Sequence, residues 1–234
     1  MKEPEAAVAD IFSSIQGEGV FVGAKQIFVR FKECNLMCSF CDEPRQGPAV
    51  VYTPRSLMSA VNLLIQEKGP HHSVSLTGGE PLCHADFLLN FLPLLRRNRI
   101  RSYLETNGTL PEALARVIDL VDIIAMDFKL PSSTGLRAFW GEHLDFLKIA
   151  SKKKVFVKAV VTANTTNKDI EKAISIINGM GKNIPFILQP ATPAREGGKE
   201  VGKERLLEFL EMGTRGDLEH IQVIPQMHKL KGVK

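Results

Sequence analysis

Hydrophobic and polar positions alternate along the chain with two different periods. Short apolar runs rich in β-branched and aromatic residues predict strands. Seven such runs occur, at 26–31, 72–79, 101–108, 121–128, 155–162, 185–191 and 220–226. Between them, apolar residues recur with the spacing of amphipathic helices. These six segments are 53–69, 85–99, 111–120, 136–153, 167–181 and 203–213. Strands separated by helices imply parallel pairing with right-handed crossovers.

Local signals predict where some helices begin and end. Thr53 is the expected N-cap of the first helix, with Pro54 at its first position and Gly69 at its end. Asn167 is the expected cap of the fifth helix, and Pro93 predicts a kink in the second. Seven strands and six helices are too few for an eightfold barrel. The pattern therefore predicts an incomplete, splayed parallel β/α barrel forming one domain over residues 1–234, with a doubly wound open sheet as the alternative.

Polar stretches follow the predicted strands. In either architecture ligands gather at the carboxyl ends of parallel strands, so these stretches are expected to share one rim. They are 34–43, 77–80, 105–108, 127–129, 162–164, 189–190 and 225–228.

Composition narrows the functional class. The 234 residues are 44% hydrophobic and 24% charged, as in ordinary globular proteins. The 30 basic residues exceed the 26 acidic ones by four. They are spread along the chain apart from residues 152–154 and a short basic tail, which fits a solvated surface or a rim that attracts an anionic substrate better than a nucleic-acid interface.

No apolar run approaches the roughly 20 residues of a membrane span, and the acidic N-terminus does not resemble a secretory signal. We therefore expect a cytoplasmic protein without a membrane or nucleic-acid partner, whose thiols stay reduced.

Three cysteines, Cys34, Cys38 and Cys41, lie within eight residues. In a reducing compartment such a cluster indicates metal binding or catalysis rather than disulfides. Thiolates favour iron–sulfur clusters, zinc and copper(I). A four-iron cluster normally takes four cysteines, so three leave one iron free for another ligand. Cys83 could supply a fourth thiolate; zinc completed by a histidine such as His71, or buried cysteines without metal, are further alternatives.

The C-x3-C-x2-C spacing after the first strand, with GGE after the second, resembles the radical S-adenosylmethionine (SAM) superfamily. Taken alone, TGGEP also fits a tight turn with positive φ at glycine. Within the superfamily, SIQGEGVFVGAKQIFVRFKECNLMCSFCD is similar to the N-terminus of the 7-carboxy-7-deazaguanine synthase family. LTGGEPL, LETNGT, DFKLPSS and VIPQMHKL match later elements of that family in order, so the resemblance covers almost the whole chain.

The resemblance implies a 4Fe–4S cluster held by Cys34, Cys38 and Cys41, with SAM on the open iron. An electron donor such as flavodoxin or ferredoxin would reduce the cluster, and cleavage of SAM would give a 5′-deoxyadenosyl radical, while the protein binds, orients and shields the cofactor. The residues implied to bind SAM are Phe40, Cys41, Asp42, Gly78, Gly79, Glu80, Asp127, Phe128 and Lys129. Many relatives have Ser-Pro-Lys where this chain has Asp-Phe-Lys.

The implied substrate is 6-carboxy-5,6,7,8-tetrahydropterin. The radical would remove a hydrogen from its C6, and the ring would contract with loss of ammonia, in queuosine and deazapurine biosynthesis. The residues implied to bind it are Ile15, Gln16, Gly17, Glu18, Arg30, Thr77 and His228. Arg30 suits the substrate carboxylate, and Gln16 and Glu18 suit the pterin edge. Taken alone, Arg30 also fits a surface ion pair and His228 an ordinary surface histidine.

Glu43 is a departure from the family pattern, which has Asp-Thr after the last cysteine and uses the hydroxyl to bind Mg²⁺. A carboxylate is a hard oxygen ligand, so we expect Mg²⁺ to bind with Glu43 as a ligand. Relatives also suggest a homodimer.

Two other functions remain open from the sequence. One is a radical SAM activase that installs a glycyl radical on a partner enzyme, in which QGEG and Arg30 would have no assigned purpose. The other is a zinc-binding structural or interaction module.

Overall fold

The computed structural model describes residues 3–41, 47–181, 183–192, 199–227 and 232. In this part of the chain nine strands form one sheet, in the order β3-β1-β2-β4-β5-β6-β7-β8-β9. Their bounds are β1 Ala6–Ile15, β2 Lys25–Phe31, β3 Val50–Tyr52, β4 Ser73–Gly78, β5 Ser102–Thr106, β6 Ile123–Asp127, β7 Lys154–Val161, β8 Phe186–Pro190 and β9 Ile221–Val223.

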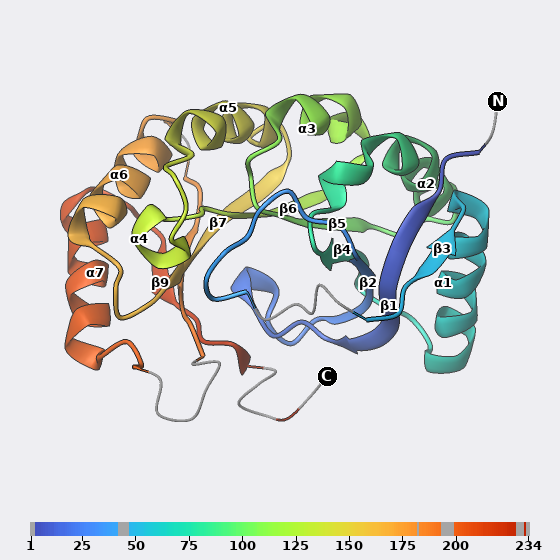
Figure 1. Cartoon of the computed structure of the whole chain (residues 1–234), viewed down its shortest axis with the longest axis horizontal. Helices are drawn as coiled ribbons and strands as arrows, with labels where there is room; N and C mark the ends of the chain where they lie inside the picture. The colour runs from blue at the N-terminus through green and yellow to red at the C-terminus, as the bar shows by residue number, and fades with distance from the viewer. Residues whose placement is uncertain (1–2, 42–46, 182, 193–198, 228–231, 233–234) are drawn as a thin grey trace.

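The seven predicted strands are confirmed as β2 and β4–β9, which pair in parallel. Two strands were not predicted: β1 pairs antiparallel with β2, and β3 pairs antiparallel with β1. The sheet curves without closing, and its larger helices form a single outer arc (Figure 1). Because the six larger helices all lie on the convex face, the fold is the incomplete barrel and not the doubly wound sheet.

The six predicted helices are also present. Their bounds are α1 Pro54–Lys68, α2 Ala85–Arg97, α3 Pro111–Val117, α5 Trp140–Ala150, α6 Asn167–Asn178 and α7 Lys203–Arg215. One turn of helix, α4 Pro131–Thr134, and three 3₁₀ helices, η1 Gly19–Phe21, η2 Pro81–His84 and η3 Ile118–Leu120, accompany them. None of the helices in the described ranges is long and apolar enough to cross a membrane.

Helix caps agree with the sequence in one case and differ in another. The Thr53 hydroxyl accepts a hydrogen bond from the Ser56 amide at 3.2 Å, and the Ser56 hydroxyl accepts one from the Thr53 amide at 2.9 Å. The prediction of Asn167 as the cap of α6 was wrong. Thr166, with extended backbone (φ −95°, ψ 153°), is the cap and accepts from the amide of Asp169.

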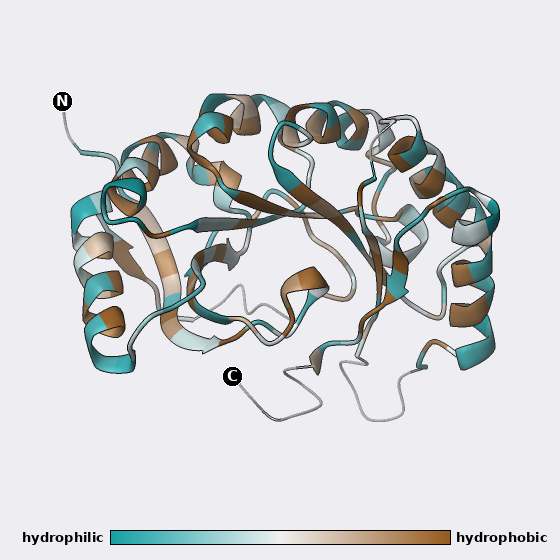
Figure 2. Ribbon diagram, turned by 180° about the vertical axis from the view of Figure 1, so that it is seen from behind, coloured by the Kyte–Doolittle hydropathy of each residue, from teal (hydrophilic) through white to brown (hydrophobic). Residues whose placement is uncertain are grey.

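Two apolar layers lie on opposite faces of the sheet. The larger layer packs the strands against the inner sides of the helices, whose outer sides are hydrophilic (Figure 2). The smaller layer fills the amino end of the barrel interior with Tyr103, Ile123, Ala125, Phe156 and Ile187, and Phe21 of η1 packs against it. This layer forms the floor of the space above it.

Candidate active site

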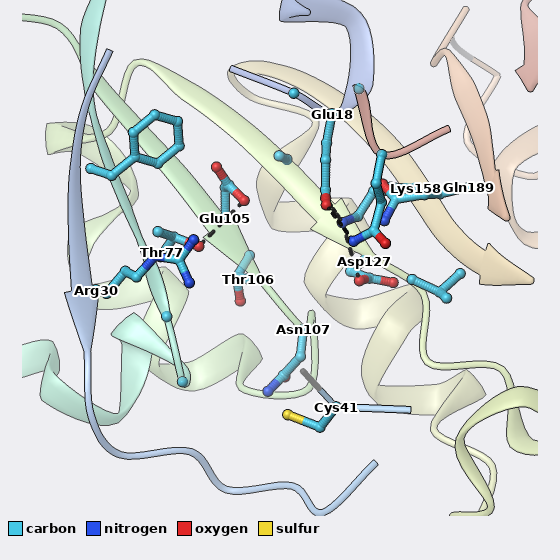
Figure 3. Close-up of a pocket in the computed structure, with 18 of the residues that line it drawn as sticks. Glu18, Arg30, Cys41, Thr77, Glu105, Thr106, Asn107, Asp127, Lys158 and Gln189 are labelled. Atoms are coloured by element: carbon cyan, nitrogen blue, oxygen red, sulfur yellow. Dashed lines mark hydrogen bonds and ion pairs between the residues drawn. The ribbon is translucent and has the colours of Figure 1, made fainter. Parts of the chain in front are cut away.

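A cavity of about 450 Å³ opens above this floor, at the carboxyl end of the strands (Figure 3). Side chains alternate along a strand, so the residue two positions after each floor residue also faces inward. These inward residues are polar: Glu105 follows Tyr103, Asp127 follows Ala125, Lys158 follows Phe156 and Gln189 follows Ile187. Six of the seven predicted polar stretches contribute residues to this cavity, and the stretch 162–164 does not.

Most of the site residues predicted from sequence line this cavity. They are Ile15, Gln16, Gly17, Glu18, Arg30, Cys34, Cys38, Phe40, Cys41, Thr77, Gly78, Gly79, Asp127 and Lys129. Two others do not line it: Glu80 is fully buried, and Phe128 stacks on His143 with ring centroids 4.7 Å apart. Asp42, Glu43 and His228 lie outside the described residues.

The cysteine loop follows β2 and closes one side of the cavity. Ser39 ties the loop to α4, since its amide donates to Thr134 O at 2.9 Å and its hydroxyl to Ser133 O at 3.0 Å. Burial raises the pKa of the Cys38 thiol; Lys129 lowers it, and Cys41 and Cys34 are close enough to raise it further. The three cysteine side chains are therefore close enough to one another to interact electrostatically.

The three cysteine side chains are the soft donors that a 4Fe–4S cluster takes. Among the described residues no three Cys, His, Asp or Glu side chains converge to hold one metal ion. A 4Fe–4S cluster needs no such convergence, because each thiolate binds a different iron. Zinc completed by His71 was a wrong alternative: His71 lies at the amino end of the sheet, where its Nε2 is 2.8 Å from Ser13 Oγ.

Cys83 is not placed as a fourth ligand. It is absent from the cavity lining, and burial together with the Glu80 carboxylate raises its pKa to about 11.

The two glycines of the GGE turn let the backbone pass close to the segment leading to Cys34. Gly78 has φ 99°, as the sequence predicted for a tight turn. A Cβ on Gly79 would lie 1.9 Å from the carbonyl oxygen of Glu33. The Gly79 amide instead donates to Phe31 O at 2.7 Å, which fastens the two segments together.

Glu80, the third residue of the GGE turn, holds this turn in place through its buried carboxylate. Its carboxylate accepts hydrogen bonds from Leu82 N at 3.0 Å, Thr106 Oγ1 at 2.8 Å and Asn107 N at 2.7 Å. Burial raises the pKa of Glu80 to about 7, and these three donors oppose that rise. The carboxylate thus joins the GGE turn to the end of β5.

Asn107 links the end of β5 to the cysteine loop. Its Nδ2 donates to Asn35 Oδ1 at 2.8 Å, and Asn35 Nδ2 donates to Thr109 Oγ1 at 2.9 Å. His143 Nε2 lies 3.3 Å from Asn107 O. Burial lowers the pKa of His143 to about 4, so its ring is neutral at physiological pH.

Charged groups alternate across the cavity wall. Lys158 Nζ lies 2.5 Å from Glu18 Oε2 and 3.6 Å from Asp127 Oδ2, and Lys129 Nζ lies 2.9 Å from the same Asp127 oxygen. Burial alone would lower the pKa of Lys158, but Glu18, Asp127 and Glu105 outweigh it and raise the pKa. Gln226 Nε2 also donates to Glu18 Oε1 at 3.0 Å, which brings the C-terminal segment to this wall.

Glu105 is held by hydroxyl and amide donors. Its Oε1 accepts from Ser75 Oγ at 2.7 Å and Gln16 Nε2 at 2.9 Å, and its Oε2 accepts from Thr77 Oγ1 at 3.3 Å. Burial and the charge of Glu18 raise the pKa of Glu105, while Lys158 and the donors lower it.

The two sides of the cavity offer opposite chemistry. Arg30 lies on β2 with its guanidinium carbon 5.4 Å from the centre of the Phe12 ring (Figure 3). On the other side, Asp127 Oδ1 and Gln189 Oε1 are buried acceptors without a hydrogen-bond partner among the described residues. A bound molecule with an anionic group at one end and N–H donors at the other would satisfy both sides.

Comparisons with known proteins decide the family. The sequence model of the Radical SAM superfamily matches residues 28–177. The 7-carboxy-7-deazaguanine synthase of Geobacter sulfurreducens is 40% identical over 99% of both chains. The enzyme of the same name from Methanothermobacter thermautotrophicus is 33% identical over 98% of both chains. The chain belongs to the 7-carboxy-7-deazaguanine synthase family of radical SAM enzymes.

Solved structures agree with this at the level of the fold. The crystal structure of QueE from Escherichia coli aligns with a TM-score of 0.62 at 18% identity, covering 94% of this chain and 93% of that one. A radical SAM methyltransferase from Sphaerobacter thermophilus aligns with a TM-score of 0.65 at 16% identity, covering 86% and 66%. Membership of the radical SAM superfamily implies a 4Fe–4S cluster and SAM.

Sequence reasoning missed several residues of the cavity as site residues, among them Glu105, Lys158 and Gln189. Glu105 and Gln189 fell within the polar stretches after strands, which was a usable signal. Lys158 lies in the middle of an apolar run, and a lone charge in such a run is the signal that could have found it.

Proposed function

We propose that this protein converts 6-carboxy-5,6,7,8-tetrahydropterin into 7-carboxy-7-deazaguanine with loss of ammonia, as a step towards queuosine and related deazapurines. The observation that carries the proposal is the polar cavity beside the cysteine loop, with Arg30 on one side and unpaired acceptors on the other. A planar pterin with a carboxylate at one end and N–H groups at the other has the complementary chemistry.

Cys34, Cys38 and Cys41 would hold the cluster through their thiolates. Bound SAM would supply the radical that removes the substrate hydrogen. Gly78 and Gly79 offer it a bare backbone edge, and Lys129, 5.7 Å from the Phe40 ring, joins the cofactor side to Asp127. Glu80, whose carboxylate already has three donors, would shape the turn without touching the cofactor. Phe128, facing His143, would act by packing.

Arg30 would bind the substrate carboxylate with two parallel hydrogen bonds. Gln189 and Glu105 would accept from the pterin N–H groups. Asp127, which the resemblance implied for SAM, is assigned here to the substrate instead, because its Oδ1 is an unpaired acceptor on the same side of the cavity. A site that buries such acceptors discriminates strongly against molecules that lack the donors, because the acceptors would then stay unpaired. Arg30→Lys removes the two-pronged contact but keeps the charge.

Reconstituted enzyme supplied with SAM, a reductant and carboxytetrahydropterin tests the function: it should form the deazaguanine, and its absence would reject the proposal. Arg30→Lys should raise the KM for substrate by about tenfold, the loss expected for one charge-assisted hydrogen bond. Arg55→Lys is the matched control, since the Arg55 side chain is 86% exposed and outside the cavity. Equal KM values for the two variants would remove Arg30 from the substrate site.

We further propose that Mg²⁺ assists the reaction with Glu43 as a ligand, because a carboxylate suits this ion. Exhaustive chelation and Glu43→Ala should each lower activity, and restored Mg²⁺ should recover it only when Glu43 is present. Unchanged activity in both cases would exclude this role.

The remaining parts of the proposal are a homodimer, a flavodoxin or ferredoxin as electron donor, and action in the cytoplasm, where thiols stay reduced. Light scattering at the mass of one subunit would contradict the dimer. The glycyl-radical activase alternative gains nothing here, because the relatives matched over nearly the whole chain are synthases.

A further inference from the structure

A chain of buried amide and hydroxyl groups runs beneath Glu105 towards the amino end of the sheet. Gln16 Nε2 donates to Glu105 Oε1 at 2.9 Å and to Gln26 Oε1 at 3.0 Å. Gln26 Nε2 in turn donates to Ser73 Oγ at 2.9 Å. Gln26 and Ser73 are both 0% exposed and neither lines the cavity, so neither can touch a ligand there.

The Gln16 side chain is almost fully used inside the protein. Both hydrogens of its amide nitrogen are donated, one to Glu105 and one to Gln26. Its Oε1 accepts from the Glu18 amide at 3.0 Å, and the residue is 3% exposed. The amide therefore has no donor left for the pterin edge, although the family resemblance implied a substrate contact.

This series of hydrogen bonds has a direction, because each side-chain amide has a donor end and an acceptor end. Gln26 Oε1 keeps the nitrogen of the Gln16 amide on the side of Glu105. Ser73 Oγ accepts from Gln26 Nε2 and lies 3.0 Å from His72 Nδ1. The Glu18 amide donates to the Gln16 oxygen and Gln26 Oε1 accepts from the Gln16 nitrogen, so together they keep the nitrogen of Gln16 towards the Glu105 carboxylate.

We propose that Gln26 is a positioning residue for substrate recognition: acting through Gln16, it orients the Glu105 carboxylate that accepts hydrogen bonds from the pterin. This inference rests on the proposed function and adds to it a residue that touches neither substrate nor cofactor. Ser75 and Thr77 hold the same carboxylate from β4, so Glu105 is fixed from two directions before substrate arrives.

The test is the substrate KM of Gln26→Leu, which keeps the volume but removes the acceptor for Gln16. We expect KM to rise about tenfold while kcat stays within about twofold, because binding is lost without a change in chemistry. SAM cleavage in the absence of substrate should stay unchanged, which also shows that the variant folds and holds its cofactor. Ser73→Ala, a smaller change that only loosens Gln26, should raise KM about threefold.

Ser102→Ala is the matched control. Ser102 lies on β5, the strand that also carries Glu105, and it is 1% exposed. Its hydroxyl donates to Asp122 at 3.1 Å and makes no hydrogen bond to Gln16, Gln26 or Ser73. Its KM should stay within about twofold of the wild type despite the lost buried hydrogen bond.

A double-mutant cycle separates positioning from general destabilisation. In a Glu105→Gln background, Gln26→Leu should add less than about twofold to KM, because the group it positions is gone. The inference would be overturned if the increase in KM of the double variant equalled the product of the two single increases. It would also be overturned if Gln26→Leu had the same KM as Ser102→Ala. Absence of product from the wild-type enzyme would instead overturn the proposed function, so the two failures are distinguishable.

Discussion

Replacing Lys158 with Met removes the cation between Glu18 and Asp127 while keeping the length of the side chain. The three side chains are 13%, 17% and 12% exposed, so the ion pairs are largely buried. Breaking a buried pair typically costs about 3–5 kcal/mol. Because these groups border a cavity, solvent screens part of the charge left behind, and we expect a loss of about 2–3 kcal/mol.

For a chain of 234 residues, this loss corresponds to a fall in melting temperature of about 5–10 °C. The assay is thermal unfolding of the Lys158→Met protein at pH 6 and pH 8. Lys152→Met is the control, since it removes the same charge from an exposed position just before β7 and should leave the melting temperature within about 1 °C.

The loss of stability caused by Lys158→Met should be larger at pH 8 than at pH 6. Burial raises the pKa of Glu105, and Lys158 opposes that rise, so removing Lys158 raises it further. The folded variant then holds the Glu105 proton more tightly than its unfolded chain, which costs stability as pH increases. If Lys158→Met had the same melting temperature as Lys152→Met at both pH values, the structural role assigned to Lys158 would be refuted.

Other predictions concern the packing under the cysteine loop. Gly79→Ala should lower the iron content of the reconstituted protein and destabilise it by more than about 2 kcal/mol, because the new Cβ would lie 1.9 Å from Glu33 O; Gly141→Ala, with no atom within 4 Å of its Cβ, should be neutral or stabilising. Burial raises the pKa of Glu80 from 4.5 to about 7, so the folded state holds this proton more tightly and loses up to about 3 kcal/mol as pH rises through that interval. Burial lowers the pKa of His143 from 6.5 to about 4, so its contribution to stability has the opposite sign and grows as pH rises between those values. Urea unfolding of Glu80→Gln should therefore show stability increasing from pH 5 to 6.5 more steeply than in the wild type; equal slopes would contradict the burial of this charge.

The order and type of the parallel elements could be predicted from the sequence. Apolar runs and amphipathic helices follow from local periodicity, so β2, β4–β9 and the six larger helices were expected. Strand β1 was missed because most of its residues are only partly buried and its pattern is weak. Strand β3 has three residues, all at least partly exposed, and exists only because it pairs with β1.

The candidate site likewise contains a part that the sequence predicts and a part that depends on the tertiary structure. The three cysteines share one loop of eight residues, so their proximity is fixed by covalent spacing and could be predicted from the sequence. The contact between Lys158 and Glu18 joins residues 140 positions apart, and Gln16 meets Glu105 across 89. Such pairs depend on strand register and on the curvature of the sheet, which no local pattern encodes.

The sequence by itself therefore determined the barrel elements, the cysteine loop and the polar stretches after the strands. Only the tertiary structure decided that Phe128 faces away from the cavity, that Lys158 faces into it, and that the Gln16 amide is already engaged. The physical reason is that a hydrogen-bonding group has a limited number of partners, and which partners it reaches depends on residues that only folding brings within 3 Å of it.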